Sequence, residues 1–286
     1  MMRSRTLVCV IVLSAALAAQ AQIEAVWLTH RSPTPDKTVV SWKSARPGPS
    51  QVCYGTDSSC PYEVRVAGEQ TIHHVEIPTP QRGTAIHYRV ATDGQRSETF
   101  AFQTCPEDGV RVAVVGDWAY ARRPKLTALK ADKPHLLMTA GDNVAQVINP
   151  SQPGDTRYIQ PYLNLIRSEA ELFATTPFMP ITGNHDKQVG PRENKRPGTS
   201  TEVYDIAATA FRTVFALPDP GWRWAFTIPQ ADATFLALDL HHVSDFGTTF
   251  QSCHDYHRGS EQFDWFDAQT RAASTGFLVT LMNEKS

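Results

Sequence analysis

Short apolar runs, separated by turn-forming residues, dominate the chain from Ile23 to about Thr104. Apolar and polar residues tend to alternate within these runs, as they do in strands that bury one face. Proline, glycine and aspartate fill the gaps between the runs and predict turns. Six or seven short strands at this spacing predict an all-β sandwich of the immunoglobulin type. The expected strands are 25–28, 38–42, 50–54, 72–77, 86–91 and 98–102.

The pattern changes after residues 105–109, a polar segment that predicts a linker. The next residues, 110–115, form a nearly continuous apolar run, which is typical of a strand buried on both faces of an α/β sheet. Further apolar runs alternate with stretches of helical character, and this alternation predicts an α/β fold. The expected elements are helix 124–131, strand 135–140, helix 158–173 and strand 178–182.

Polar residues follow three of these apolar runs at the same relative point. Asp117, Asp142 and Asn184 each come directly after a glycine, and His185 follows Asn184. Because loops at the carboxyl ends of strands in an open α/β sheet gather at one rim, we expect these side chains to lie together. Two carboxylates, an amide oxygen and an imidazole suit ions such as Mn, Fe or Zn. One Gly-Asp pair is common in turns, but three successive junctions favour a metal site.

These motifs resemble those of the calcineurin-like metallophosphoesterases, and among them the purple acid phosphatases. Their order and approximate spacing are those of the family's first three motifs, and they read Gly116-Asp117-Trp118, Gly141-Asp142-Asn143-Val144 and Gly183-Asn184-His185-Asp186. Residues 26–29, 39–42, 52–56 and 87–90 resemble the fibronectin-type domain that precedes the phosphatase domain in plant and bacterial members. Residues 233–239 and 260–266 resemble the family's later strand and helix.

The resemblance implies a fibronectin III-like domain over residues 23–105 and a calcineurin-like metallophosphoesterase domain over residues 110–286. It implies two metal ions, Fe, Zn or Mn, with Asp117 binding the first, Asp142 bridging both and Asn184 binding the second. The implied catalytic residue is His185, which steadies the phosphoryl oxygens and helps protonate the leaving alcohol. The implied reaction is acid phosphatase-like hydrolysis of small phosphate esters by a metal-activated hydroxide.

Three positions depart from the family's pattern. Ala119 stands where the wider family has a histidine, and Ala145 stands where purple acid phosphatases have a tyrosine. The apolar run 276–282 is followed by Asn283 instead of histidine, and no Gly-His-x-His motif follows before Ser286. We therefore expect a domain that is incomplete at its C-terminus, with weak metal binding and reduced activity. The alternative is a non-catalytic exported binding protein, or a truncated relic of a phosphatase.

Other histidines are candidate replacements for the missing ligands. His241 and His242 follow an apolar run, and His254 and His257 have a spacing that reaches one ion from a helical turn. The interpretation that we favour makes them loop or substrate-facing histidines. A ligand histidine needs an orienting partner, and such a partner is not visible in the sequence.

The N-terminus predicts export. Arg3 and Arg5 precede an apolar run, Leu7 to Ala19, and a small-x-small triplet ends at Ala21, so residues 1–21 are expected to be a cleaved signal peptide. The run is shorter than the roughly 20 residues of a spanning helix, so stable membrane insertion is not expected. The expected location is secreted or periplasmic. A net charge of −2 offers no positive field for nucleic acid. The partner that the resemblance implies is a small phosphate ester.

Four cysteines remain after the signal peptide, namely Cys53, Cys60, Cys105 and Cys253. An exported protein can keep disulfides, and four cysteines allow three pairings. We favour a bridge between Cys53 and Cys60, which flank a predicted turn. The alternative for Cys105 and Cys253 is that they are free, buried thiols.

Overall fold

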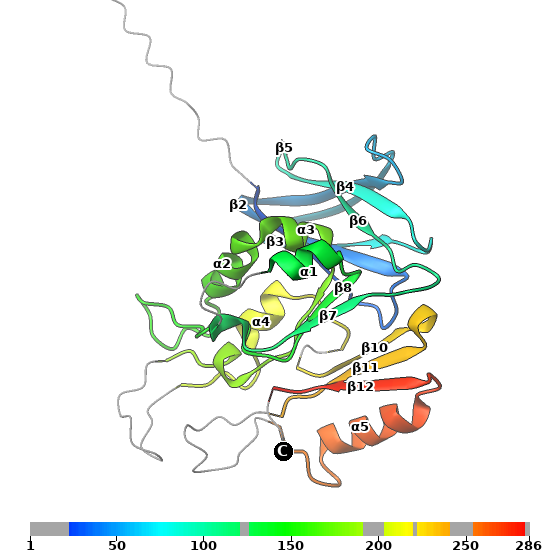
Figure 1. Cartoon of the computed structure of the whole chain (residues 1–286). Helices are drawn as coiled ribbons and strands as arrows, with labels where there is room; N and C mark the ends of the chain where they lie inside the picture. The colour runs from blue at the N-terminus through cyan, green and yellow to red at the C-terminus, as the bar shows by residue number, and fades with distance from the viewer. Residues whose placement is uncertain (1–22, 121–125, 191–202, 220–221, 241–253, 284–286) are drawn as a thin grey trace, which may run out of the picture.

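The computed structural model describes residues 23–120, 126–190, 203–219, 222–240 and 254–283 (Figure 1). The expected signal peptide, residues 1–21, lies outside the described residues, so its cleavage stays a prediction. Within the described ranges, no helix is both long enough and apolar enough to cross a bilayer.

The first part of the chain is one antiparallel six-stranded sheet, which we call the N-terminal sheet. Its central strand β2 pairs with β1, β3 and β4, and β4 also pairs with β5 and β6. Alternate residues of these strands pack into a common core that includes Leu28, Trp42, Val75 and Tyr88. The strands are β1 (Ile23–Thr29), β2 (Lys37–Gly55), β3 (Tyr62–Pro78), β4 (Ala85–Thr92), β5 (Gln95–Arg96) and β6 (Phe100–Gln103). The all-β character is confirmed, and the finer assignment to a fibronectin-like sandwich stays a prediction.

Two details of the N-terminal sheet differ from the sequence prediction. Residues 46–49, in the gap between the expected strands 38–42 and 50–54, lie inside β2, where the register with β3 shifts between Lys43 and Gly48. Prolines are tolerated there because a bulge leaves some backbone amides outside the ladder. Strand β3 begins at Tyr62 instead of Ile72. Its first half is mostly exposed and does not show the alternation of buried and exposed residues seen in its second half.

The predicted bridge between Cys53 and Cys60 is wrong. Cys53, Cys60 and Cys105 are free thiols, and Cys253 lies outside the described residues. The strand register explains the difference, because it places Glu63 opposite Cys53. The Cys60 thiol instead contacts the backbone carbonyl of Asp57 at 3.8 Å.

The second part of the chain holds two three-stranded sheets. In the first, β7 (Val112–Val115), β8 (Leu136–Thr139) and β9 (Phe178–Met179) are parallel. In the second, β11 (Ala233–Ala237) pairs antiparallel with β10 (Trp224–Ile228) and parallel with β12 (Phe277–Leu281). The sequence patterns predicted β7, β8, β9, β11 and β12 with longer bounds, but they predicted no strand at the place of β10.

Five α-helices and three short 3-10 turns connect these strands in the described residues. The helices are α1 (Thr127–Asp132), α2 (Gln160–Ser168), α3 (Ala170–Thr175), α4 (Thr209–Val214) and α5 (Glu261–Ala272). The turns are η1 (Trp118–Tyr120), η2 (Asn184–Asp186) and η3 (Pro229–Ala231). The single helix expected over 158–173 is two helices, because the backbone leaves the helical region at Glu169.

The two parts of the chain share a buried boundary. Helices α2 and α3 lie between the N-terminal sheet and the strands β7 to β9 (Figure 1). Trp27 of β1 donates its indole N–H to the carbonyl of Val214 at 3.0 Å, and Tyr88 of β4 donates its hydroxyl to Ala174 at 2.6 Å. Both bonds are buried, so they tie the N-terminal sheet firmly to the part of the chain that carries the site.

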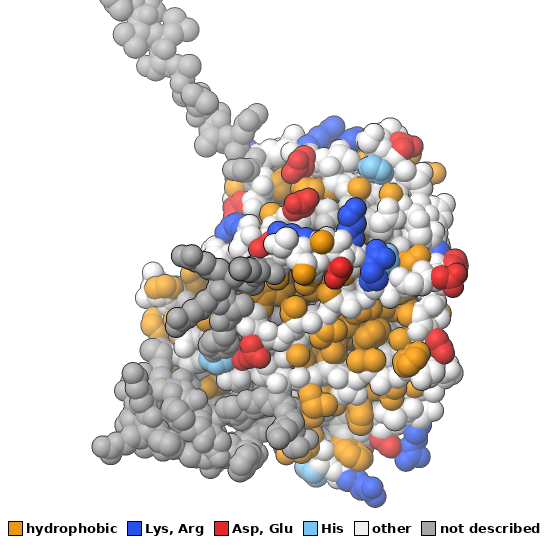
Figure 2. All heavy atoms as spheres, in the orientation of Figure 1, with side chains coloured by type: hydrophobic (Ala, Val, Ile, Leu, Met, Phe, Trp, Pro, Cys, Tyr) orange, Lys and Arg blue, Asp and Glu red, His pale blue; other side chains and the backbone are white. Residues whose placement is uncertain are grey.

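Strand β7 is an edge strand, whereas the sequence predicted a strand buried on both faces. Val114 at its centre is 50% exposed. Strand β12 is the corresponding edge of the second sheet, where Phe277 is 65% exposed and Leu278 and Val279 are also exposed. Apolar side chains gather on the face of the molecule that holds β7 and β10 to β12 (Figure 2). Exposed apolar edges of this kind favour association between chains.

Replacing Phe277 by lysine is expected to lower self-association of the purified chain several-fold. A lysine on β12 removes apolar surface and opposes pairing with another strand edge. Light scattering over a concentration series measures the effect. Tyr62→Lys is the control, because Tyr62 is a comparably exposed aromatic residue on the N-terminal sheet. Equal association of both variants and the parent would show that β12 does not drive it.

Candidate functional site

Three loops at the carboxyl ends of β7, β8 and β9 form the candidate site. Val115 pairs with Thr139 and Met138 pairs with Met179, so the three strands end at the same edge of the sheet. We call residues 116–119 the first loop, residues 140–144 the second loop and residues 182–187 the third loop. The loops that follow these strands therefore lie at one rim of the sheet.

Hydrogen bonds join the three loops around Asp142. The amide of Ala119 in the first loop donates to the Asp142 carbonyl at 3.1 Å. The amide of His185 in the third loop donates to Asp142 Oδ1 at 3.2 Å. Asp142 is 5% exposed, while Asn184 and His185 are half-buried and Asp117 is exposed. The loops that carry the four predicted site residues therefore meet, with Asp142 in the middle.

The backbone of this rim is strained. Asp117 and Asp142 have φ angles of 49° and 51°, in the left-handed region that costs non-glycine residues about 1 kcal/mol or more. Aspartate is among the residues that tolerate this region best. Glycine is required at position 183, because a Cβ atom there would lie 2.1 Å from Asp142 Oδ1. Such strain persists only where the surrounding structure enforces it, and it clusters at functional sites.

A buried carboxylate, Asp186, holds the second and third loops together. Its Oδ2 accepts from the amide of Gly183 at 2.9 Å and from the amide and side chain of Asn143 at 3.2 and 3.0 Å. Its Oδ1 accepts from the Tyr162 hydroxyl at 3.1 Å. Burial raises the pKa of the Asp186 carboxyl to about 7; the Gly183 amide opposes this shift, and the nearby Asp142 carboxylate adds to it. Sequence reasoning gave Asp186 no role, although its place in the third motif was a signal.

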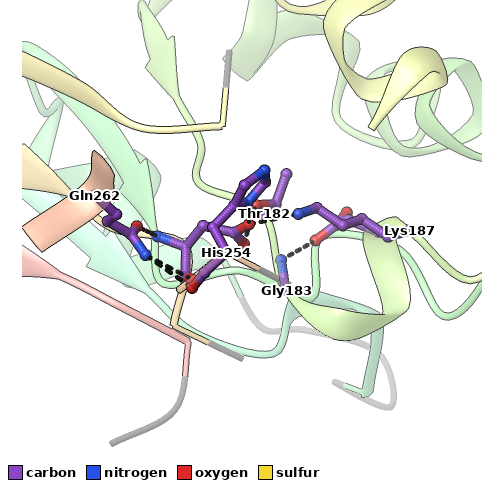
Figure 3. A network of polar contacts seen from close by, with 7 residues as sticks. Thr182, Gly183, Lys187, His254 and Gln262 are labelled. Atoms are coloured by element: carbon purple, nitrogen blue, oxygen red, sulfur yellow. Dashed lines mark hydrogen bonds and ion pairs between the residues drawn. The ribbon is translucent and has the colours of Figure 1, made fainter. Parts of the chain in front are cut away.

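A buried ion pair lies directly behind the third loop (Figure 3). Lys187 Nζ donates to Asp239 Oδ2 at 2.6 Å, and both side chains are fully buried. Thr182 Oγ1 donates to Asp239 Oδ1 at 3.1 Å, and His254 Nδ1 contacts Asp239 Oδ2. Sequence reasoning missed this network. The available signals were a lysine directly after the third motif and an aspartate that ends an otherwise apolar run.

The end of β12 reaches the same rim. Asn283 Nδ2 donates to the carbonyl of Ala140 at 2.9 Å. It also lies so close to Gly141 that a Cβ atom there would be 2.9 Å from Asn283 Nδ2. The residue that the resemblance expects to be a histidine is therefore an asparagine whose amide binds the backbone of the second loop.

The histidines that are candidate replacement ligands have different surroundings in the part of the chain that the structure describes. His254 contacts the buried Asp239 carboxylate, and Trp222 stacks on its ring with 3.7 Å between ring centroids. His257 is exposed. His241 and His242 lie outside the described residues. Of the two candidate histidines that the structure describes, His254 has an orienting carboxylate.

The oxygen donors of the rim fit a hard metal ion. Asp117, Asp142 and Asn184 offer two carboxylates and an amide oxygen from three loops in contact, and such donors suit Mn, Mg, Fe or Zn. Within the described ranges, however, no three His, Cys, Asp or Glu side chains form a group that could hold a metal ion. The number of ions and their identity therefore stay predictions.

Two solved structures share this fold. The chain is similar to the purple acid phosphatase PPD1 isolated from yellow lupin (Lupinus luteus) seeds, with a TM-score of 0.62 and 15% sequence identity over 89% of this chain and 50% of that one. It is also similar to PhoD, with a TM-score of 0.60 and 16% identity over 90% of this chain and 61% of that one. The chain matches no protein-family model and no curated protein sequence. It thus spans about half of the lupin enzyme and about three fifths of PhoD.

These likenesses show the fold, since function depends on the residues of a site. The predicted purple acid phosphatase-like fold is confirmed at that level. The boundaries of the two predicted domains and the expected incompleteness at the C-terminus stay predictions.

Proposed function

We propose that the chain is a metal-dependent phosphoesterase that hydrolyses small phosphate esters at the rim of the three loops. One observation carries the proposal: Asp142 lies buried between the loop of Asp117 and the loop of Asn184 and His185. The fold shared with purple acid phosphatase PPD1 and PhoD supports it. In the same proposal the chain is exported by residues 1–21, and a fibronectin III-like domain over 23–105 precedes the phosphoesterase domain over 110–286.

Each rim residue has a distinct role in this proposal. Asp117, Asp142 and Asn184 would hold the metal ions, Fe, Zn or Mn. When bound, the ions supply neutralisation of the phosphate charge and activation of water. Asp186 binds no ion but keeps the second and third loops in register through Gly183 and Asn143.

His185 is the proposed catalytic acid. Its Nδ1 lies 2.7 Å from the carbonyl of Ala145. A carbonyl only accepts, so Nδ1 is the protonated donor, and this bond fixes the plane and tautomer of the ring. The Nδ1 proton stays in that bond, so we assign the contact with a phosphoryl oxygen, and the proton transfer to the leaving alcohol, to Nε2–H of the doubly protonated ring.

A non-catalytic exported binding protein is the second candidate, and the position of Asn283 favours it. The Asn283 amide is turned to the Ala140 carbonyl. In this arrangement the end of β12 supports the loop backbone and adds no imidazole to the rim.

Replacing Asp142 by asparagine is the test of the proposed function. Asparagine tolerates the left-handed backbone, so the fold should persist while the bridging charge is lost. We expect Mn²⁺ or Zn²⁺ affinity and the hydrolysis of a chromogenic phosphate monoester to fall by about 100-fold or more, beyond the loss that follows removal of a group that only orients a ligand. Calorimetric titration of metal-depleted protein and steady-state rates measure both.

Asp93→Asn is the matched control, because Asp93 has a φ angle of 49° in a turn of the N-terminal sheet. It should bind and turn over like the parent. Metal affinities and rates that are equal in the parent and in Asp142→Asn would remove the phosphoesterase proposal and leave the binding protein as the better one.

A further inference from the structure

One buried carboxylate holds the third loop at both of its ends. At the beginning of the loop, Thr182 Oγ1 donates to Asp239 Oδ1 at 3.1 Å. At its end, Lys187 Nζ donates to Asp239 Oδ2 at 2.6 Å. The labelled side chains of Thr182 and Lys187 reach toward each other behind the loop (Figure 3). The residues between them include the proposed ligand Asn184 and the proposed acid His185.

Asp239 is itself held in place from two other segments. Its amide donates to Gln262 Oε1 of α5 at 2.7 Å, and Gln262 Nε2 donates back to the Asp239 carbonyl at 3.3 Å. Gln262 Nε2 also donates to the carbonyl of His254 at 3.3 Å. The third loop and His254 thus contact the Asp239 carboxylate, and helix α5 bonds the backbone of the same residue.

Stability alone is a weak explanation for this ion pair. Lys187 and Asp239 are both fully buried, and removing two charges from water costs several kcal/mol per ion. Replacing a buried ion pair by well-packed apolar residues of similar volume often leaves the stability of the fold unchanged or raises it. What the pair provides that apolar contacts do not is a set of directional bonds, and these bonds converge on the two ends of the third loop.

We propose that Asp239 and Lys187 are positioning residues of the rim. They fix residues 183–186 so that the Asn184 side chain and the His185 ring keep their places beside Asp142. This inference rests on the proposed function and deepens it, because it names the residues that set the geometry of the third loop.

The test removes both charges together in the double variant Lys187→Met, Asp239→Leu. No unpaired charge remains in the interior, so the melting temperature should stay close to that of the parent. We expect Mn²⁺ affinity, measured by calorimetry, to fall about 10-fold. Losses of this size are typical when a group that orients a metal ligand is removed. We also expect kcat for a chromogenic phosphate monoester to fall more than KM changes. Hydrogen exchange of the Gly183, His185 and Asp186 amides should become faster while the N-terminal sheet is unaffected.

A matched pair of threonine variants decides the question if the double variant fails to fold. Thr182→Val removes one of the two bonds that hold the loop. Thr38→Val makes the same change at an equally buried threonine of the N-terminal sheet, where Thr38 bonds Thr79. We expect Mn²⁺ affinity to fall several-fold in Thr182→Val and to equal that of the parent in Thr38→Val.

The outcomes separate this inference from the proposed function. Unchanged Mn²⁺ affinity and unchanged exchange of the loop amides, in a folded double variant or in Thr182→Val, overturn the positioning role. A parent protein that binds no Mn²⁺ overturns the proposed function. In that case the exchange of the Gly183, His185 and Asp186 amides still decides whether Asp239 and Lys187 fix the loop.

Discussion

Replacing Lys187 alone by methionine is expected to lower the free energy of unfolding by about 3–5 kcal/mol. The change leaves the Asp239 carboxylate fully buried without its cationic partner. Thr182 still donates to that carboxylate and His254 still contacts it, but neither replaces the fully buried ammonium group of Lys187. Urea denaturation followed by circular dichroism measures the loss, and the slope with denaturant should be unchanged if the folded state keeps its compactness.

Two controls give this measurement its meaning. The double variant Lys187→Met, Asp239→Leu should recover most of the lost stability, since it removes the buried Asp239 carboxylate as well. Lys37→Met removes a lysine whose pairing with Glu76 is solvent-exposed, and it should change stability by less than about 1 kcal/mol. If Lys187→Met proves as stable as the parent, water or another group must neutralise Asp239 and the buried ion pair is not essential.

Acidification from about pH 6.5 to about pH 4 is expected to destabilise the protein by about 3 kcal/mol for each of His30 and His73. Burial lowers the pKa of each ring from 6.5 to about 4. Between these values the unfolded chain binds a proton that the folded chain does not, so stability falls as acid is added. Below about pH 4 both states are protonated and the loss stops.

The surroundings of these rings explain why they stay neutral. His73 stacks on Trp42 and bonds the hydroxyls of Ser44 and Ser50 at 2.9 and 2.8 Å. His30 Nδ1 donates to the carbonyl of Lys37 at 2.7 Å, and its ring stacks on Phe226. Among the residues that the structure describes, no carboxylate is hydrogen-bonded to either ring, and the charge of Glu76 raises the pKa of His30 less than burial lowers it.

His30→Phe isolates the contribution of one ring. The variant keeps a flat ring against Phe226 but has no group to protonate. Unfolding free energies of the parent and the variant, measured at several pH values, should converge as the pH falls from 6.5 to 4. Carboxylates titrate alike in both proteins and cancel in the difference. A difference that does not change with pH would show that His30 is not protonated on unfolding in this range.

The three loops of the rim were predictable because local sequence marks them. An apolar run followed by glycine and a polar residue identifies the end of a buried strand, and parallel strands bring such ends together. The contact of Asp142 with the first and third loops agrees with that expectation. The sequence pattern could not show which side chains are buried. It also gave no reason to expect that Asp186 joins the second and third loops through hydrogen bonds.

The network behind the rim was not predictable from local sequence. Lys187 and Asp239 are 52 residues apart in the chain, so only the packing of the third loop against the segment after β11 makes them partners. The N-terminal sheet shows the same limit. Proline and glycine at residues 47–49 indicate a turn, yet β2 continues through them, paired with β3 at Gly48 and with β4 from Gln51 to Gly55. Pairing over long distances overrides local preference in both cases.

The left-handed backbone at Asp117 and Asp142 lowers the stability of the fold at the positions of two proposed metal ligands. Glycine adopts that conformation without steric cost, so glycine at either position would relieve roughly 1 kcal/mol of strain. A library screened for heat resistance alone would therefore enrich glycine at positions 117 and 142 and discard both carboxylates. Engineering of this chain has to select for ion binding together with thermal tolerance, because the most accessible gains in one erase the other.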